Sequence, residues 1–302
     1  MTKKPPAAPK PAPLTDLSFA VIGDPIAHSL SPFIHNFLYQ IYDLSADYQA
    51  IKVAKGRLKE DFWPLLLNKR LHGFNVTMPH KKDIIPFLEQ LSEESRLIES
   101  VNTVIRTPQG LKGFSTDGAG FLRSLAAQGL QKKGGKAVLF GSGGAAAALT
   151  LAWSRQMQAP LTIIARSPQK AQAFLAKIPQ QQAKVQLLPW EKEYFSQALC
   201  DATLLVNTTP LGMQGKAADF SDFNDFSFLT QLAPQALVYD LIYQPRQTTL
   251  LQKASALGYR TLNGIDMLIY QALEAFTLMT GQTTSDHDKE VIVRALTDQG
   301  LI

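Results

Sequence analysis

Residues 136–149 read KAVLFGSGGAAAAL and contain the pattern Gly141-x-Gly143-x-x-Ala146. Apolar residues precede Gly141, as in a buried strand, and the alanine run after Gly143 favours a helix. Glycine permits a tight turn at 141 and lets a phosphate approach the backbone at 143, and the small Ala146 permits close packing of the helix on a sheet. The stretch predicts a strand, a turn and a helix that hold the pyrophosphate of a dinucleotide. A glycine-rich turn without a ligand is the alternative.

Strand-like and helix-like apolar runs alternate along most of the chain, which is typical of an α/β protein. We expect strands at residues 19–22, 48–53, 73–76, 103–105, 111–114, 137–140, 161–165, 185–188, 203–206 and 237–241. Helical patterns cover residues 32–42, 58–68, 117–128, 267–280 and 287–296. From residue 137 onward the rhythm resembles a Rossmann unit. The sequence therefore predicts an N-terminal α/β substrate domain plus a Rossmann-like dinucleotide domain, with a cleft between them.

These patterns divide the 302 residues into a tail and two domains. Residues 1–15 are rich in lysine and proline, and we expect them to be disordered. Residues 16–117 are predicted to form the substrate-binding and catalytic domain, and residues 118–263 the dinucleotide domain. Because no strand follows the last two helical patterns, we expect residues 264–302 to pack back on the first domain and complete it.

Composition and charge narrow the class of protein. The formal net charge is +5, but Lys3, Lys4 and Lys10 of the tail contribute three of these charges, so no nucleic-acid partner is expected. The longest apolar runs are shorter than the roughly 20 residues that span a membrane, so no membrane partner is expected. Cys200 is the only cysteine and no secretion signal is evident, which together indicate a reducing compartment, and we expect the cytoplasm.

Basic and hydroxyl side chains follow the strand expected at residues 161–165. Arg166, Ser167 and Lys170 lie where an NAD-specific chain carries a carboxylate for the ribose 2′-hydroxyl. A guanidinium forms charge-assisted bidentate bonds to a phosphate, so these residues suit a 2′-phosphate and predict NADP as the cofactor. A solvated basic helix start is the alternative.

Polar clusters follow the expected strands of the first domain, where α/β sheets bind their ligands. They are GDPIAHSLSP at residues 23–32, GFNVTMPHK at 73–81, VNT at 101–103 and STDG at 115–118. Their hydroxyls, amides and Lys/Asp pair suit a small ligand with several hydroxyls and a carboxylate, since each buried polar group requires a partner.

A family resemblance rests on motifs that occur in a fixed order: GDPIAHSLSPFIHN, GFNVTMPHK, VNT, STDGAG, GSGGAAAA, NTTPLGM, DLIYQPRQTTLL and NGIDMLIYQALEAF. Over about residues 19–281 the sequence closely resembles the shikimate dehydrogenases, including their quinate/shikimate branch. The resemblance implies reversible, NADPH-dependent reduction of 3-dehydroshikimate to shikimate, on the route to chorismate and the aromatic amino acids. Two alternatives stay open: a quinate/shikimate dehydrogenase with relaxed use of NAD and NADP, and a non-catalytic ligand-binding protein on the same scaffold.

Carried over residue by residue, the resemblance implies that Lys81 and Asp117 are the catalytic pair. The chemistry agrees, because an ammonium that bonds to and protonates a carbonyl oxygen stabilises the negative charge that hydride addition builds there. Asp117 would orient the lysine and bind a neighbouring hydroxyl. The alternatives are a solvated Lys81 and an Asp117 that only caps the helix it opens.

The side chains implied to bind the substrate are Ser29, Ser31, Thr77, Asn102, Tyr243 and Gln271. The two serines take the carboxylate with the tyrosine nearby, and the other three hold the ring hydroxyls. Alternatives remain for four of them. Ser31 before Pro32 also suits a helix N-cap, and Ser29 a loop turn. Tyr243 also suits a packed or surface aromatic, and Gln271 a surface amide.

The residues implied to bind NADP are Gly141, Gly143, Gly144, Ala145, Ala146, Arg166, Ser167, Lys170, Thr208, Met213, Gly264 and Met267. Met213 is implied to lie near the nicotinamide, and an ordinary core methionine is the alternative. The five histidines form no metal-binding pattern, so no metal is expected. The sequence does not define the oligomeric state, and a homodimer is one possible assembly.

Three sites depart from the family pattern. Glu99 and Ser100 stand where a Gly-Ala pair usually precedes VNT, which bears on the position of the loop that carries Asn102. Ser115 replaces a common asparagine, which bears on the choice of substrate. Ala165 replaces an asparagine that often precedes the cofactor arginine, which bears on the preference for NADPH.

Overall fold

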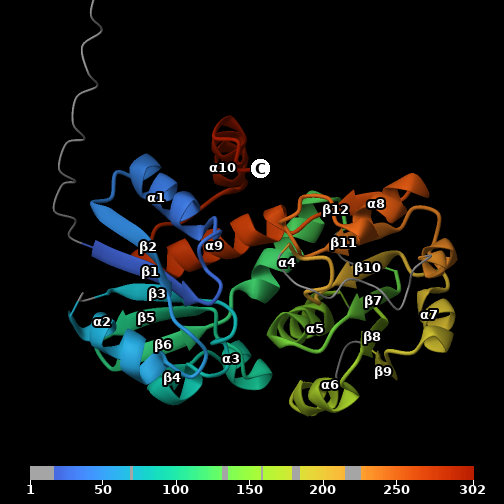
Figure 1. The fold of residues 1–302 in the computed structure, drawn as a ribbon, viewed down its shortest axis with the longest axis horizontal. Coiled ribbons are helices and arrows are strands. Elements are labelled where there is room, and N and C mark those ends of the chain that lie inside the picture. The colour runs from blue at the N-terminus through green and yellow to red at the C-terminus, as the bar shows by residue number, and fades with distance from the viewer. Residues whose placement is uncertain (1–16, 69–70, 131–134, 158, 179–183, 215–225) are drawn as a thin grey trace, which may run out of the picture.

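A computed structural model describes residues 17–68, 71–130, 135–157, 159–178, 184–214 and 226–302. The tail predicted at residues 1–15 lies outside these residues. The described chain forms an α/β structure with two six-stranded sheets, which confirms the predicted class. Figure 1 shows the two sheets on either side of helices α4 (Asp117–Ala127) and α9 (Ile265–Thr280). Within the described ranges, no helix is long and apolar enough to cross a membrane.

The first sheet is mixed, with the strand order β2-β1-β3-β5-β6-β4. Its strands are β1 (Leu17–Gly23), β2 (Ala46–Lys52), β3 (Gly73–Val76), β4 (Gln90–Leu91), β5 (Thr103–Thr107) and β6 (Gly110–Phe114). Its helices are α1 (Ser31–Ile41), a π turn (Leu58–Phe62) continued by α2 (Trp63–Asn68), a 3-10 turn (Ile85–Phe87) and α3 (Glu93–Ile98). Strand β5 is antiparallel to β3, so the chain leaving β3 and the chain entering β5 lie at the same edge of the sheet. This pairing brings the GFNVTMPHK and VNT motifs together.

The second sheet is parallel in all its described strand pairs, with the order β12-β11-β10-β7-β8-β9. Its strands are β7 (Ala137–Phe140), β8 (Leu161–Ala165), β9 (Val185–Pro189), β10 (Leu204–Asn207), β11 (Leu237–Asp240) and β12 (Arg260–Leu262). Its helices are α5 (Gly144–Gln156), α6 (Pro168–Leu175), α7 (Lys192–Leu199), a 3-10 turn (Ser227–Gln231) and α8 (Thr249–Ala256). The strand order reverses between β7 and β10, and doubly wound sheets bind their ligands at such a switch point.

Apolar side chains cover both faces of each sheet. Ala137 and Leu139 of β7 point into one cluster of buried residues, and Val138 and Phe140 point into another. Strand β1 divides its side chains between two further clusters in the same way. Because successive side chains of a strand face opposite sides, a strand buried on both faces has an uninterrupted apolar sequence.

Helices α9 and α10 (Asp286–Asp298), although last in the chain, pack on the first sheet. Ile269 and Phe276 of α9 lie in the apolar cluster of β1 and α1, together with Ile292 of α10. Near its start, α9 also contributes Met267 to a cluster of the second sheet. One helix is therefore part of both cores.

Helix α4 crosses α9 at Gly120, where the two backbones come close. A Cβ atom on Gly120 would lie 2.8 Å from the backbone nitrogen of Gln271 and 3.0 Å from the carbonyl oxygen of Met267. One turn later, Arg123 donates to Glu274 at 2.9 Å across the same crossing. The crossing sets the start of α4 at a fixed position relative to α9.

Every strand expected from the sequence is present, and residues 73–76, 137–140 and 161–165 match the observed bounds without any shift. The patterns did not indicate β4, β12, α3, α7 and α8. Strands β4 and β12 span two and three residues and helix α3 spans six, which is too short for a period to be seen. The helix expected at residues 58–68 begins as a π turn.

The substitution Gly120→Ala tests the crossing. We expect it to lower the free energy of unfolding by about 1–3 kcal/mol, because the added methyl group would force two backbones apart. This loss would occur although alanine is the better helix former. Denaturation in urea, followed by circular dichroism, measures the change, and Ala119→Gly on the exposed side of α4 controls for helix propensity alone. A Gly120→Ala protein as stable as the wild type would show that the crossing tolerates a side chain.

Candidate active site

Lys81 and Asp117 form an ion pair at the centre of the candidate site. Lys81 lies in the turn after β3, and its Nζ donates to Asp117 Oδ2 at 2.6 Å. The Lys81 side chain is 23% exposed and that of Asp117 is 6% exposed, so Lys81 is not freely solvated. Asp117 is not the N-cap of α4, because Thr116 holds that position. An ammonium has three N–H groups, so Lys81 keeps donors for a ligand oxygen.

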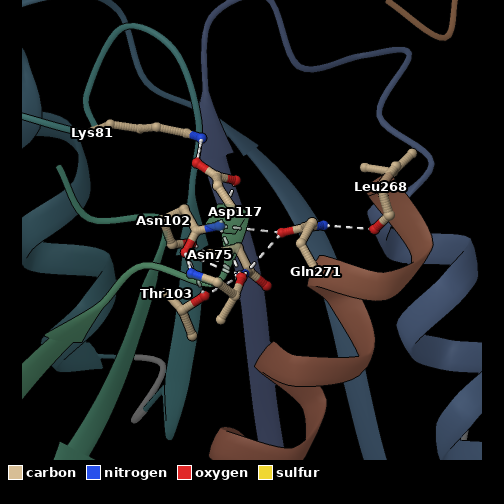
Figure 2. A network of polar contacts seen from close by, with 8 residues as sticks. Asn75, Lys81, Asn102, Thr103, Asp117, Leu268 and Gln271 are labelled. Carbon is tan, nitrogen blue, oxygen red and sulfur yellow. Dashed lines mark hydrogen bonds and ion pairs between the residues drawn. The ribbon is translucent and has the colours of Figure 1, made fainter. Parts of the chain in front are cut away.

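Asn102 and Gln271 complete the polar centre, as Figure 2 shows. Asn102 is 3% exposed, and its Nδ2 donates to Asp117 Oδ1 at 2.9 Å and to Gln271 Oε1 at 3.3 Å. Its Oδ1 accepts the backbone N–H of Thr116 at 2.8 Å. Since a backbone N–H can only donate, this bond fixes which end of the Asn102 amide faces Asp117. Gln271 is no free surface amide, because its Nε2 donates to the carbonyl of Leu268 at 2.8 Å.

Tyr48 and Asn75 are joined to this centre by hydrogen bonds, although the sequence analysis gave neither a role. The Tyr48 hydroxyl donates to Asn75 Oδ1 at 2.6 Å, and the ring of His35 stacks on the Tyr48 ring with centroids 4.2 Å apart. Asn75 Nδ2 donates to the carbonyl of Asn102 and to Thr103 Oγ1, both at 3.0 Å. The feature of the sequence that could have pointed to Asn75 is an amide side chain within the otherwise apolar strand GFNV.

His80 anchors the turn that carries Lys81. It is fully buried, and its Nε2 lies 2.7 Å from the carbonyl oxygen of Val53. A carbonyl only accepts, so Nε2 carries the proton. Thr77 opens the same turn, and its hydroxyl makes no hydrogen bond to any described residue, which leaves it available to a ligand.

In the part of the chain that the structure describes, no group of three or more His, Cys, Asp or Glu side chains could hold a metal ion.

Among the described residues, no hydrogen bond joins Ser29, Ser31 or Tyr243 to the polar centre. Ser31 is the first residue of α1 and does not cap it, because Leu30 holds the N-cap position without a side-chain bond. Ser29 Oγ accepts the backbone N–H of Ser31 at 3.3 Å. Tyr243 packs against the apolar cluster of β1 and α1, and burial raises its pKa.

The glycine-rich loop stands at the switch point of the second sheet. Gly141 has a φ of +119°, and a Cβ there would lie 2.4 Å from Thr208 Oγ1. Thr208 donates both its N–H and its hydroxyl to the carbonyl of Phe140, at 2.9 and 2.6 Å, and so ties the ends of β7 and β10 together. A Cβ on Gly143 would meet nothing within 4 Å, so the space over the start of α5 is open. With the unpaired N–H groups of a helix start beside it, this loop fits a phosphate group.

Arg166, Ser167 and Lys170 follow β8 as expected. Arg166 and Lys170 are exposed, and neither forms an ion pair with a described carboxylate. Ser167 is the N-cap residue of α6 and its side chain makes no capping bond. Two cations without an ion pair to a described carboxylate and one hydroxyl without a capping bond suit a 2′-phosphate, and they equally suit the alternative of a solvated basic helix start.

The remaining predicted cofactor residues differ in exposure. Gly144 and Ala145 open α5 and are half-buried, whereas Ala146 is fully buried under the helix. Met213 is half-buried in the turn after β10, while Met267 is 7% exposed and belongs to an apolar core. Gly264 admits no side chain, since a Cβ would lie 2.0 Å from the carbonyl oxygen of Leu241.

Next to the departure at Glu99 and Ser100, Asn102 makes hydrogen bonds with Asp117, Thr116 and Gln271. Glu99 has a φ of +48°, a left-handed conformation that glycine adopts more readily. Hydrogen bonds from Lys177 and then from Lys82 lower the pKa of Glu99. The Ser100 side chain faces the glycine-rich loop, because a Cβ on Gly144 would lie 2.7 Å from Ser100 Oγ.

Comparison with known proteins gives the family. A model of the shikimate dehydrogenase substrate binding domain matches residues 21–104, and one of the shikimate 5′-dehydrogenase C-terminal domain matches residues 264–284. A protein of Desulfitobacterium hafniense (strain Y51) named shikimate dehydrogenase (NADP(+)) is 39% identical over 261 residues, which are 85% of this chain and 90% of the relative. The chain belongs to the shikimate dehydrogenase family.

Solved structures of shikimate dehydrogenases agree with this fold. Shikimate 5-dehydrogenase from Listeria monocytogenes, in complex with shikimate and NAD, is 30% identical with a TM-score of 0.80 and covers 95% of this chain and 99% of its own. The enzyme from Thermus thermophilus, in complex with NADP(H) and shikimate, is 30% identical with a TM-score of 0.75 and covers 92% and 99%. The resemblance found in the sequence motifs is thereby confirmed.

The buried His35 makes the free energy of unfolding of this shikimate dehydrogenase fold depend on pH. Burial lowers the pKa of His35 from 6.5 to about 3, so between these values the unfolded chain binds the proton more readily. The stability that the neutral ring confers is therefore complete above pH 6.5 and is lost as the pH falls towards 3, with a slope of at most about 1.4 kcal/mol per pH unit. His35→Phe keeps the stacking and should flatten the acid limb of stability, measured by denaturation at several pH values. His287→Gln, at a histidine with 79% side-chain exposure, is the control. Equal acid limbs in wild type and His35→Phe would contradict the expectation.

Proposed function

We propose that this chain catalyses the reversible, NADPH-dependent reduction of 3-dehydroshikimate to shikimate. The observation that carries the proposal is the ion pair of Lys81 and Asp117, which Asn102 joins through a hydrogen bond to the same carboxylate. Membership of the shikimate dehydrogenase family supports it. The reaction belongs to the route to chorismate and the aromatic amino acids.

Lys81 is the proton donor of the reaction in this proposal. The cofactor, when bound, supplies the hydride that reduces the carbonyl carbon. Lys81 Nζ bonds to the carbonyl oxygen and gives it a proton as negative charge builds there, which lowers the barrier. Asp117 holds the ammonium in place through its Oδ2, at 2.6 Å. In the reverse direction Lys81 takes the proton of the hydroxyl that is oxidised.

The remaining polar side chains bind the substrate. Thr77, Asn102 and Gln271 bind ring hydroxyls, and the carboxylate lies with Ser29, Ser31 and Tyr243. Residues 16–117 and 264–302 form the substrate domain in this proposal, and residues 118–263 form the NADP domain. Asp117 opens α4, so the carboxylate would stand where the chain passes from one domain to the other.

The cofactor lies over the switch point of the second sheet. The pyrophosphate is held at residues 141–146, and the 2′-phosphate by Arg166, Ser167 and Lys170. Thr208, Met213, Gly264 and Met267 form the nicotinamide side of the site. NAD in the Listeria structure and NADP(H) in the Thermus structure keep relaxed cofactor use as a second candidate, which the absence of a carboxylate at position 166 disfavours.

The proposal includes the cytoplasm as the location, because Cys200 is an exposed free thiol that suits a reducing compartment. A homodimer belongs to the proposal as a possible assembly, and sedimentation of the purified protein measures it.

Initial rates with shikimate or quinate, each with NADP or NAD, test the activity, and Lys81→Ala tests the mechanism. We expect the wild type to prefer shikimate with NADP, and Lys81→Ala to lower kcat by about 10²–10⁴-fold, the range for loss of an acid/base group. Lys82→Ala, at the exposed neighbouring lysine, is the matched control and should keep the wild-type kcat. Undiminished turnover by Lys81→Ala would remove that residue from the mechanism. A folded wild type without turnover in any combination would support a ligand-binding protein instead.

Arg166→Ala tests the cofactor preference. Loss of charge-assisted hydrogen bonds to a phosphate costs about 1.5–3 kcal/mol, so we expect the kcat/KM for NADP to fall by about 10- to 150-fold while that for NAD changes little. Steady-state rates at saturating shikimate measure both values. Lys253→Ala, which removes an exposed cation of α8, controls for net charge. Equal losses with the two cofactors would rule out a phosphate contact at Arg166.

A further inference from the structure

The Asn75 amide is fully engaged within the protein. The residue is 7% exposed, and its Nδ2 uses one hydrogen for the carbonyl of Asn102 and the other for Thr103 Oγ1. Its Oδ1 accepts the hydroxyl of Tyr48. With both N–H donors used, Asn75 has none left for a ligand, so its effect on a bound substrate has to pass through its neighbours.

The hydrogen bonds among Tyr48, Asn75, Thr103 and Asn102 can be assigned in only one direction from donor to acceptor. Burial raises the pKa of Tyr48 well above 10, so its hydroxyl keeps its proton and donates to Asn75. Thr103 Oγ1 accepts from Asn75 and therefore turns its own hydrogen to Asn102 Oδ1, at 3.0 Å. Figure 2 shows this sequence of bonds leading from Asn75 through Thr103 and Asn102 to Asp117 and Lys81.

Tyr48 is itself held firmly by helix α1. Asn36 bonds to both backbone groups of Tyr48, accepting its N–H at 2.9 Å and donating to its carbonyl at 2.8 Å. The His35 ring lies parallel to the Tyr48 ring, with an interplanar angle of 2°. The hydroxyl that faces Asn75 is thus fixed at both its backbone and its ring.

The bond from Asn102 to Asp117 has competitors. Asn102 Nδ2 carries two hydrogens but has three acceptors within reach, Thr116 Oγ1 at 2.9 Å, Asp117 Oδ1 at 2.9 Å and Gln271 Oε1 at 3.3 Å. A small rotation of the amide decides whether Asp117 keeps its donor. The two bonds from Asn75, to the Asn102 carbonyl and through Thr103 to its side chain, oppose such a rotation.

We infer that Asn75 and Tyr48 are positioning residues, which hold Asn102 in the orientation that binds substrate and keeps Asp117 aligned with Lys81. The inference rests on the proposed function, because Asn102, Asp117 and Lys81 act there on the substrate. Nothing in it requires either positioning residue to touch the ligand.

Tyr48→Phe is the first test, because it deletes one hydroxyl and leaves the ring. We expect kcat with shikimate and NADP to fall by about 3- to 20-fold, as for the loss of one hydrogen bond, and the Kd of shikimate alone, from calorimetry, to rise. Tyr42→Phe is the control, since the Tyr42 hydroxyl donates to the carbonyl of Thr283 at 3.0 Å and to Asp288 Oδ2 at 3.1 Å, and neither residue is assigned to the substrate or the cofactor. It should lower the melting temperature similarly and leave kcat and Kd unchanged.

A double-mutant cycle separates positioning from a general loss of structure. In an Asn102→Ala background, Tyr48→Phe should change kcat by less than about twofold, because the residue through which it acts is gone. Thr103→Val, of similar shape but without the hydroxyl, should reproduce the loss of kcat and serves if Tyr48→Phe does not fold.

The two proposals fail in different ways. A wild type that neither turns over nor binds shikimate overturns the proposed function, and the inference with it. An active wild type whose Tyr48→Phe and Thr103→Val variants keep wild-type kcat and Kd overturns the inference alone. Full additivity of Tyr48→Phe and Asn102→Ala also overturns it.

Discussion

The close approach of helices α4 and α9 at Gly120 is the constraint on which the rest of the structure depends. Asp117 lies one turn before the crossing on α4, and Gln271 contributes its backbone nitrogen to the contact itself. Because Gly120 has no side chain, α4 and α9 can come close although they are far apart in the sequence. Their contact brings Asp117 and Gln271 within hydrogen-bonding distance of Asn102. Because α9 is buried in both cores, the same contact also sets the distance between the two sheets.

Around this crossing, hydrogen bonds to backbone groups fix the orientation of the polar side chains. The Thr116 N–H fixes the amide of Asn102, and the Val53 carbonyl fixes the ring of His80, whose neighbour is Lys81. Such bonds hold a site in shape before a ligand arrives, which reduces the reorganisation that binding requires. The Lys81–Asp117 pair is therefore supported from several strands and helices rather than from one loop.

Strand bounds followed closely from the sequence, since strands buried on both faces, such as β7 and β8, are uninterrupted apolar runs. Lys81, Asp117, Asn102 and Gln271 were named from motifs, and the structure joins them by hydrogen bonds. Tyr48 and Asn75 were missed because their partners lie 27 residues apart in the chain, a pairing that depends on strand register. Ser31 before Pro32 suggested a helix N-cap, but the helix begins one residue earlier than this pair suggests, and Leu30 holds the N-cap position.

Glu99 forms ion pairs with two lysines. Lys82 lies in the turn after β3 of the first sheet, and Lys177 lies just after α6 of the second sheet. Exposed ion pairs weaken as dissolved salt screens them, whereas the apolar contacts of α9 do not. The two sheets are thus joined in two ways, by the packing of α4 and α9 and by the exposed ion pairs of Glu99, and the second contact depends more on ionic strength than the first. Ionic strength would therefore act on the contact between the two sheets at Glu99.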